Sequence, residues 1–330
     1  MNVVRETASV HHRSRPMLVR AADAIYWMSR YMERAEAVAR LLSVHAGLLI
    51  DVGELPSHAE QALWRGVLAT MRIDNVPSGP APLPQRVMRF VTFDPQSPMS
   101  LTSCLTRVRE NARAVRERIS AEMWESLNRL YWFIHDQDAS RRFDESPEDL
   151  WREIITGSML FQGLCDQTIA HDQRWHFTQT AKYLERVDYT CRAIQTRLAL
   201  LTPAEHQVES PLRSLHWSAV LRSCCSIEAF RQNHGTGFDP LAVVSFLVLD
   251  GGFPRSVLFS VMRAREAVTA VAAETGHAMT AQRILGRLEA TLRYAQPAEI
   301  AHQGIASYMQ GLQSQVAEAG ADLQDTYFLY

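Results

Sequence analysis

The sequence lacks the features that mark a chain for export, for a membrane or for a metal centre. Its five cysteines are odd in number and form no CxxC pair, a spacing that fits neither a disulfide framework nor a zinc cluster. The longest apolar run, 243–249, is seven residues including a serine, far too short to span a bilayer. Residues 1–16 contain no apolar h-region, so they do not resemble a secretory signal. We therefore expect a cytoplasmic protein with buried thiols, a disordered extension over 1–16 and a folded part from about Met17.

A large excess of charge of either sign is also missing. The net charge is −2, which argues against a general electrostatic grip on nucleic acid or on anionic lipid. Neither nucleic acid nor a membrane is therefore an expected partner. The basic residues are nearly all arginine and are interleaved with glutamate and aspartate, a pattern that suits specific ion pairs better than a diffuse positive field.

Helical periodicity dominates the sequence. Over 21–49 the apolar residues follow the i, i+3, i+4, i+7 spacing of a helix with one buried face. Similar patterns predict helices over about 60–72, 101–119, 121–137, 147–170, 174–200, 214–230, 254–274, 281–295 and 300–329. Two apolar segments, 89–93 and 243–249, fit either an extended segment or a short buried helix. The predicted fold class is all-α, a helical bundle.

The chain also resembles itself. Four blocks recur in the same order at offsets of 152 to 156 residues: 31–40 with 183–192, 64–68 with 217–221, 90–100 with 246–256, and Arg109-Glu110 with Arg265-Glu266. Four matches in register indicate an internal duplication, with repeat unit one over about 18–165 and repeat unit two over about 171–325. Because no Pro/Gly-rich linker separates the two related helical units, we expect them to pack into one body over 17–330.

The first recurring block places a polar stripe opposite the apolar stripe of its helix. The stripe alternates in sign and comprises Arg30, Glu33, Arg34, Glu36 and Arg40 in the first unit and Lys182, Glu185, Arg186, Asp188 and Arg192 in the second. One interpretation is a solvated face with exposed ion pairs of little energetic weight. The other interpretation has the two stripes facing each other across a polar groove. There Arg34 and Arg186 would bind an anion, while Glu33 and Glu185 would orient them or bind an amine.

A second cationic segment lies further along the chain. It contains Arg107, Arg109, Glu110, Asn111, Arg113 and Arg116. The last three arginines stand at i, i+4 and i+7, so they would share one helical face and could grip a carboxylate or a phosphate. The alternative is an exposed face paired with Glu110 and Glu117. Trp124, just after this segment, is expected in the core.

Candidate catalytic groups are few. No serine or cysteine stands in a recognisable nucleophile motif, and no phosphate loop is present. His171 could be catalytic, but Asp172 beside it suits a helix N-cap, and a histidine before a helix is more often structural. Two converging carboxylates could hold a metal, but no histidine at ligand spacing accompanies them, so neither a metal nor another cofactor is expected. Arg231 and Arg255 are candidate anion contacts, and Pro254 is expected in the first turn of a helix that opens there.

Several of these motifs resemble the bacterial alpha-E family, which is named for its predicted helices and its Glu-Arg motif. The segments that carry the resemblance are 24–36, 109–113, 124–128, 171–175, 184–186 and 246–257, and the resemblance extends over about 17–329. Lys182 and Val187 depart from the family, which often has arginine and alanine at these positions. The resemblance implies partnership with a circularly permuted ATP-grasp enzyme, a carboxylate–amine ligase, and with a transglutaminase-like protein. Such systems are proposed to make or remove a peptide or a peptide tag, and some relatives are fused to the ATP-grasp part.

Three functions remain open at this point. The first is an accessory or substrate-binding protein for the ligase and the transglutaminase-like protein, which holds a peptide or an acidic small molecule in the Glu-Arg groove. The second is a stand-alone transferase or hydrolase with Glu33 or Glu185 as general base and the arginines as an anion clamp. The third is a purely structural scaffold. We expect the first, without catalytic activity of its own, because nucleophile, metal and nucleotide motifs are missing.

Overall fold

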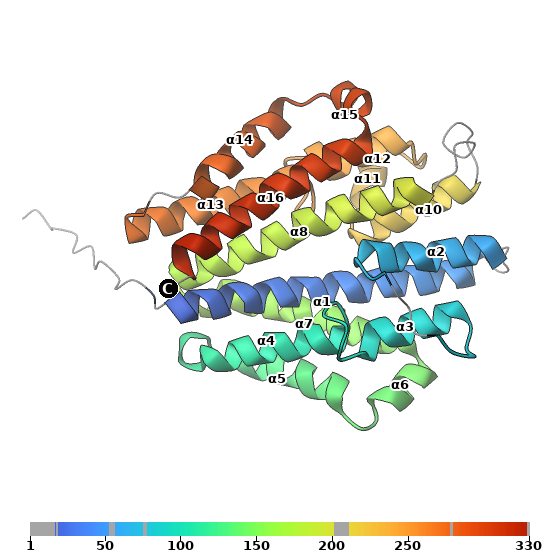
Figure 1. Ribbon diagram of the computed structural model, residues 1–330, viewed down its shortest axis with the longest axis horizontal. Helices are drawn as coiled ribbons and strands as arrows, with labels where there is room; N and C mark the ends of the chain where they lie inside the picture. Colours follow the sequence, from blue (N-terminus) through green and yellow to red (C-terminus); the bar gives the residue numbers. More distant parts are fainter. Residues whose placement is uncertain are drawn as a thin grey trace, which may run out of the picture.

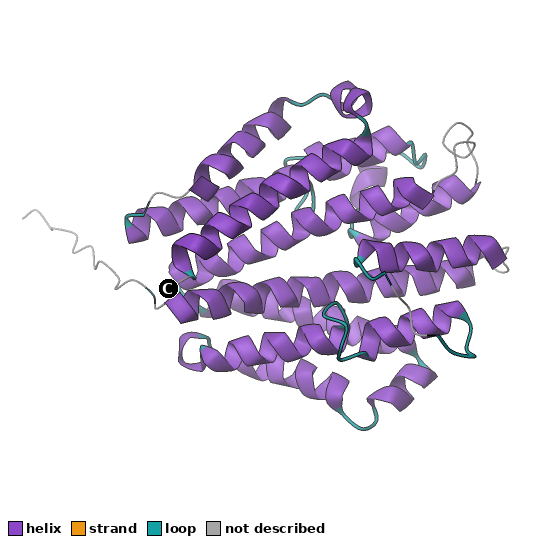
Figure 2. Ribbon diagram, viewed as in Figure 1, coloured by secondary structure: helices purple, strands orange, loops and turns teal. Residues whose placement is uncertain are grey.

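All regular secondary structure in the described part of the chain is helical, as the periodicity predicts (Figure 2). The computed structural model describes residues 17, 19–52, 57–74, 78–200, 211–277 and 280–328. The extension predicted over 1–16 lies outside these residues. Two long helices, α1 (Val19–Val52) and α8 (Gln173–Leu200), run side by side through the middle of the molecule (Figure 1).

The remaining helices flank this central pair on both sides (Figure 1). Those after α1 are α2 (Ser57–Thr70), α3 (Leu83–Phe93), α4 (Leu101–Ala114), the 3-10 helix η1 (Arg116–Arg118), α5 (Ala121–His135), α6 (Ala139–Glu145) and α7 (Pro147–Thr168). Those after α8 are α10 (Pro211–Ser223), α11 (Ile227–His234), α12 (Pro240–Leu249), α13 (Val257–Thr275), α14 (Thr280–Tyr294), α15 (Pro297–Gln303) and α16 (Ile305–Tyr327). α4 and α7 pack against α1, and α13 and α16 pack against α8. In addition, α2 packs on α8 and α10 packs on α1, so the two halves of the chain are interleaved.

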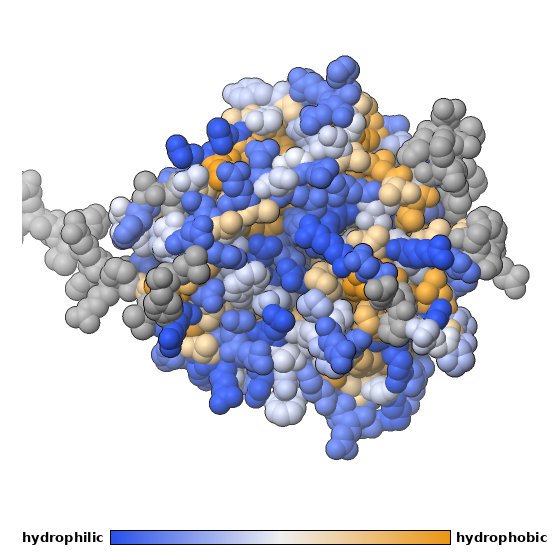
Figure 3. Space-filling model, in the orientation of Figure 1, coloured by the Kyte–Doolittle hydropathy of each residue, from blue (hydrophilic) through white to orange (hydrophobic). Residues whose placement is uncertain are grey.

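The buried apolar side chains form one continuous cluster that draws on helices from α1 to α16. Trp64, Trp151 and Trp217 are among its largest members, and all three are fully buried. On the face shown in Figure 3, hydrophilic side chains dominate and hydrophobic ones are scattered between them. The two predicted units therefore share a core.

Both apolar segments that fit either a strand or a helix are helical. The first, 89–93, is the end of α3, and the second, 243–249, is most of α12. In α12 the carboxylate of Asp239 accepts a hydrogen bond from the amide of Ala242 at 2.8 Å, and Pro240 occupies the first turn. This capping starts a helix where the apolar run alone was ambiguous.

Several predicted helices differ from the structure at their boundaries. The segment 214–230 is divided by Cys225, which has a φ of 53° and separates α10 from α11. Gly304, with a φ of 87°, divides 300–329 into α15 and α16. The helix predicted from 254 begins at Val257, because the hydroxyl of Ser256 accepts the amide hydrogen bond of Phe259 and caps it there. Pro254 therefore lies in the turn before the helix.

The helices that contain Trp64 and Trp217 end in the same way. α2 is followed by Arg72 with a φ of 55°, and α10 is followed by Cys225 with a φ of 53°. A left-handed backbone at a non-glycine residue is uncommon, and here it occurs at two positions that the sequence alignment of the halves brings close together. The duplication itself stays a prediction from the sequence.

Candidate functional site

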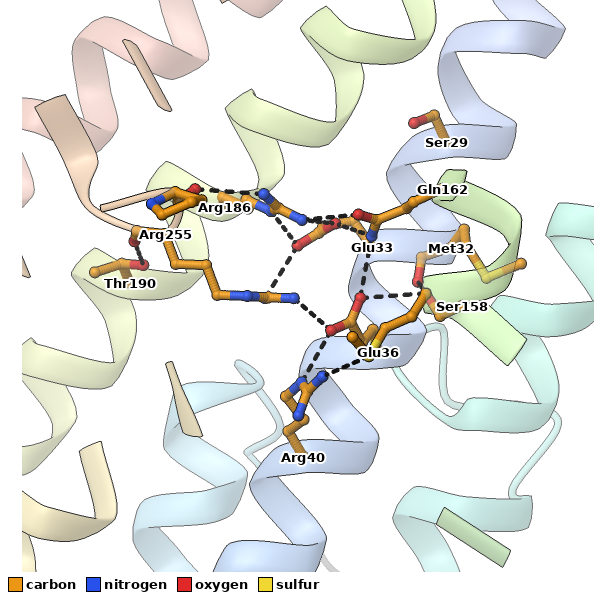
Figure 4. Close-up of polar contacts among 12 residues, drawn as sticks. Ser29, Met32, Glu33, Glu36, Arg40, Ser158, Gln162, Arg186, Thr190 and Arg255 are labelled. Atoms are coloured by element: carbon orange, nitrogen blue, oxygen red, sulfur yellow. Dashed lines mark hydrogen bonds and ion pairs between the residues drawn. The ribbon is translucent and has the colours of Figure 1, made fainter. Parts of the chain in front are cut away.

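The polar stripes of α1 and α8 face each other and are joined by ion pairs. Arg186 of α8 donates from Nε to Oε1 of Glu33 on α1 at 2.6 Å (Figure 4). In the opposite sense, Arg34 of α1 donates from Nε to Oε1 of Glu185 on α8 at 2.7 Å and from Nη2 to Oε2 at 3.0 Å. Each Glu-Arg dipeptide thus pairs with the other. We call these four residues the Glu-Arg cluster.

A second carboxylate on α1, that of Glu36, lies beside the cluster (Figure 4). Arg255, from the turn before α13, pairs with Glu36 and lies 3.3 Å from Oε1 of Glu33. Arg40 donates to Glu36 at 2.9 Å. Gln162 of α7 joins the two carboxylates, because its Nε2 donates to Glu33 at 2.9 Å and to Glu36 at 3.1 Å. The predicted anion contact Arg255 is therefore brought to the stripe, where it binds the protein's own carboxylates.

The corresponding carboxylate on α8 is that of Asp188. Arg192, one turn further along, lies 3.1 Å from it. Arg72, after the end of α2, also reaches it at 3.1 Å, and Gln313 of α16 donates to it at 3.0 Å. Elements from both halves therefore converge on α8 as well as on α1.

The carboxylates are buried, which excludes the solvated-face interpretation. Glu33, Glu36 and Glu185 expose 2%, 0% and 1% of their surface. Exposed pairs contribute little to stability, whereas a buried carboxylate requires hydrogen-bonding and charged partners. Each of these three has such partners: those of Glu185 come from α1 and α8, and those of Glu33 and Glu36 also come from α7 and from the turn before α13.

The electrostatics keep two of these carboxylates, those of Glu36 and Glu185, ionised. Burial alone would raise the pKa of Glu185, but the charges of Arg34 and Arg30 outweigh it and hold the pKa well below its usual range. Arg30 donates to Glu185 at 2.8 Å. For Glu36, too, burial opposes ionisation and the neighbouring arginines lower the pKa overall. Such carboxylates bind protons weakly near neutral pH.

The stripes meet, as the facing interpretation predicts, but the arginines of the cluster are already paired. Arg34 donates two hydrogen bonds to one carboxylate, and Arg186 donates to Glu33 and to Oε1 of Gln162 at 3.0 Å. A ligand anion would have to displace a buried glutamate to bind either guanidinium. The arrangement is a closed ion-pair network between two helices.

The second cationic segment makes contacts of its own. Arg109 donates to Oδ1 of Asn128 at 2.8 Å and lies 4.4 Å from the ring centroid of Tyr131. α4 ends at Ala114, so Arg116 falls in η1 and the predicted three-arginine face is interrupted there. The same break explains why the predicted helix 101–119 is too long.

The other residues of that segment are mostly exposed. Glu110 and Arg113 are exposed, and the amide of Asn111 donates to the carbonyl of Arg107 at 2.8 Å. Trp124 is half-buried at the edge of the core. The predicted anion contact Arg231 is also exposed, on α11.

His171 lies at the surface before α8. It is exposed and stacks on Trp175, with ring centroids 4.1 Å apart. The predicted N-cap is confirmed, because Oδ1 of Asp172 accepts the amide hydrogen bond of Arg174 at 2.9 Å. His171 is not within the Glu-Arg cluster.

A cleft of about 450 Å³ lies between the start of α8, the end of α7 and α13. Asp166, His171, Trp175, Lys182, Phe259 and Arg263 are among its lining residues. Lys182 belongs to the predicted stripe but faces this cleft as well as the stripe. No spacing in the sequence signals the cleft, because its walls come from three helices; the one available signal is that Lys182 is the only lysine of the chain.

Two neutral residues of the site have no signal in the sequence either. Gln162 and Gln313 bring side-chain amides to Glu36 and Asp188, which lie 126 and 125 residues away in the chain. Glutamine is common on exposed helix surfaces, and neither residue stands in a recurring block. Only helix packing reveals their role.

The cysteines of the chain take no part in the ion pairs of the Glu-Arg cluster, which join arginine to glutamate. Four of the five cysteines are buried as predicted, and Cys225 is half-buried. Within the described ranges, no group of three or more His, Cys, Asp or Glu side chains is placed to hold a metal ion. Over the same ranges, no helix is both long and apolar enough to cross a membrane.

Comparison with known proteins identifies the family of this chain. A family model described as a predicted alpha-helical domain with a conserved ER motif matches residues 17–328. The chain belongs to the Alpha-E family. In this Alpha-E protein the ER dipeptides at Glu33-Arg34 and Glu185-Arg186 are the ones that pair reciprocally.

The Alpha-E chain is also similar to uncharacterized proteins of Mycobacterium bovis and Mycobacterium tuberculosis. Each is 24% identical to it over 323 residues, which cover 91% of this chain and 34% of the relative. The chain therefore spans about a third of the length of these curated relatives. No solved structure matches it.

Proposed function

We propose that this Alpha-E chain is an accessory or substrate-binding protein. It acts with a circularly permuted ATP-grasp carboxylate–amine ligase and a transglutaminase-like protein in the synthesis of a peptide or peptide tag. The observation that carries this proposal is that the arginines and glutamates of the Glu-Arg cluster are paired with each other. In this arrangement, the ER dipeptides fasten α1 to α8 and so hold the surfaces on which partners and substrates would bind.

The same observation weighs against a stand-alone enzyme that uses Glu185 as its base. A general base needs a pKa near the working pH. The pKa of Glu185 lies far below that, because Arg34 and Arg30 stabilise its ionised form against the effect of burial. The arginines proposed as an anion clamp are engaged with glutamates.

The length of the relatives supports a role beside other domains. This chain corresponds to about a third of each mycobacterial protein. An Alpha-E unit therefore occurs in longer chains, where two thirds of the polypeptide is available for other activities. Within such a protein, a rigid helical body is suited to act as a binding platform.

The test is reconstitution with the ATP-grasp ligase and the transglutaminase-like protein of the same organism. We expect the full chain to co-elute with the ligase on size exclusion and to increase ATP-dependent ligation of a peptide, measured as ADP release together with product mass. Chain denatured by heat is the control. Unchanged ligation with no complex would refute the proposal, and sustained turnover by the chain alone would favour the stand-alone enzyme.

A further inference from the structure

The single lysine of the chain is placed in an unusual environment. Lys182 is 7% exposed, and its ammonium makes no hydrogen bond or ion pair with any residue that the structure describes. It lies 4.7 Å from the ring centroid of Tyr183. Its Nζ is not among the fully buried polar atoms that lack a hydrogen-bond partner, so the ammonium is open to the adjoining cleft and can bind an anion there.

The charged groups around Lys182 do not bind its ammonium directly. Oδ1 of Asp166 on α7 accepts from Nε1 of Trp175 at 2.9 Å and from Nε2 of Gln179 at 3.0 Å, and this carboxylate acts on the ammonium only through its charge. Glu33 of α1 is committed to Arg186. Burial and the nearby charge of Arg186 together lower the pKa of Lys182, while Asp166 and Glu33 only partly oppose them.

The cleft beside Lys182 has the size and lining of a small-molecule site. Its volume of about 450 Å³ lies within the usual range for ligand pockets. Trp175 and Tyr183 of α8 and Phe259 of α13 provide aromatic walls. Arg263 lies on the α13 side, where it pairs with Glu266 at 2.7 Å.

We infer that Lys182 and this cleft bind a carboxylate-bearing small molecule or peptide end, with the carboxylate on the Lys182 ammonium and an apolar or aromatic part between Trp175, Tyr183 and Phe259. Two acidic groups, Asp166 and Glu266, line the same cleft, and they disfavour a doubly charged group such as phosphate. The inference does not depend on partnership with a ligase, because it concerns a site within this chain alone.

Hippurate is a suitable probe, since it joins one carboxylate to an aromatic ring. We expect isothermal titration calorimetry of the full chain to show saturable binding of hippurate. Its uncharged amide and inorganic phosphate should each bind at least about tenfold more weakly, because the amide brings no negative charge to the ammonium and phosphate has no aromatic part to fill the cleft. Equal binding of the amide, or tighter binding of phosphate, would overturn the carboxylate assignment.

Substitutions of Lys182 test its role in binding hippurate. Lys182→Met should weaken hippurate binding by about 10- to 100-fold, the loss expected for a charge-assisted contact, whereas Lys182→Arg should retain most of it. Arg129→Met removes a positive charge from an exposed position on α5 and serves as the matched control. Circular dichroism confirms that each variant is folded. Undiminished binding by Lys182→Met, or no saturable binding by the unmodified chain, would overturn the inference.

A second measurement uses the fact that Lys182 is the only lysine. Reductive methylation with ¹³C-formaldehyde labels this amine and the chain's α-amino group, and the Lys182→Arg variant identifies the α-amino signal. The titratable groups facing Lys182 are Glu33 of α1, Cys165 and Asp166 of α7, His171 before α8, His176, Tyr183 and Arg186 of α8, and Arg263 and Glu266 of α13. Hippurate should raise the NMR titration midpoint of Lys182, because a bound carboxylate favours the ammonium. An unmoved midpoint at saturating hippurate would contradict the site.

Discussion

At the scale of single residues, the Glu-Arg cluster shows how strongly burial changes the value of an ion pair. Glu185 is 1% exposed and accepts hydrogen bonds from Arg30 and Arg34. Glu145 and Arg141 form a pair of similar length, 2.9 Å, but both side chains are more than half exposed. Removing one partner leaves an uncompensated charge in the first case and a solvated charge in the second.

Substitution of Glu185 should therefore be severe. We expect Glu185→Gln to lower the free energy of unfolding by about 3–5 kcal/mol, because Arg30 and Arg34 lose their anionic partner in a buried place. Glu145→Gln should lower it by less than about 1 kcal/mol. Urea denaturation followed by circular dichroism measures both. Losses of equal size in the two variants would show that the cluster does not stabilise the fold.

The lowered pKa of Glu185 also predicts a pH dependence. In the unfolded chain this carboxyl titrates near its ordinary value of 4.5, and in the folded chain it titrates lower. Its contribution to stability is thus complete above 4.5 and is lost as the pH falls toward the folded pKa. Between about pH 5 and pH 3 the unmodified chain should lose stability more steeply than Glu185→Gln. Parallel curves from urea titrations at each pH would argue against this linkage.

At the scale of helices, close approach depends on small residues at particular positions. A Cβ added to Gly157 of α7 would lie 2.8 Å from Cγ of Leu130 on α5, and Leu130 is itself buried. At Gly163 of the same helix, nothing lies within 4 Å of an added Cβ. The two glycines therefore differ in packing although both stand in one helix.

This difference gives a matched pair of substitutions. Gly157→Ala should destabilise the protein by about 1–3 kcal/mol, because Leu130 cannot move away within a packed core. Gly163→Ala should instead stabilise it by up to about 1 kcal/mol, through the higher helix propensity of alanine. Thermal unfolding of both variants is the measurement. A shift of the melting temperature in the same direction for both would contradict the packing of α5 on α7.

At the scale of the whole molecule, the two halves depend on each other. α2 packs on α8 and α10 packs on α1, so each half covers part of the other. The carboxylates of Glu33 and Glu36 are neutralised by Arg186 and Arg255 from the second half. Either half alone would expose apolar surface and leave buried charges without partners.

A fragment experiment tests this dependence. We expect residues 17–168 alone to lack a cooperative thermal transition and to bind a hydrophobic dye. Addition of residues 171–328 should restore a cooperative transition, because it returns the arginine partners and the covering helices. A sharp transition in the first fragment by itself, at a temperature close to that of the full chain, would mean that each half folds independently.

The helical class, the central helices and the polar stripes on them could be predicted from the sequence alone. These features are local, because the apolar periodicity and the order of charges within some 30 residues are enough to predict them. The stripe from Arg30 to Arg40 is an example. The ends of the helices were predicted less accurately from the sequence. The helix ends at Cys225 because the backbone there has a positive φ, and neither the cysteine side chain nor its neighbours in the sequence predict that conformation.

The use of the stripes depends on contacts between helices that are distant in the chain. Glu33 meets Arg186 across 153 residues of chain, and such a pairing depends on the packing of α1 on α8, which no local pattern encodes. The same packing buried the cluster, lowered the pKa of Glu185 and closed the groove that the charge pattern suggested. It also turned Lys182 toward a cleft with walls from three helices. Charge order is a property of one helix, whereas the choice between a paired arginine and an open site depends on what the neighbouring helices place beside it.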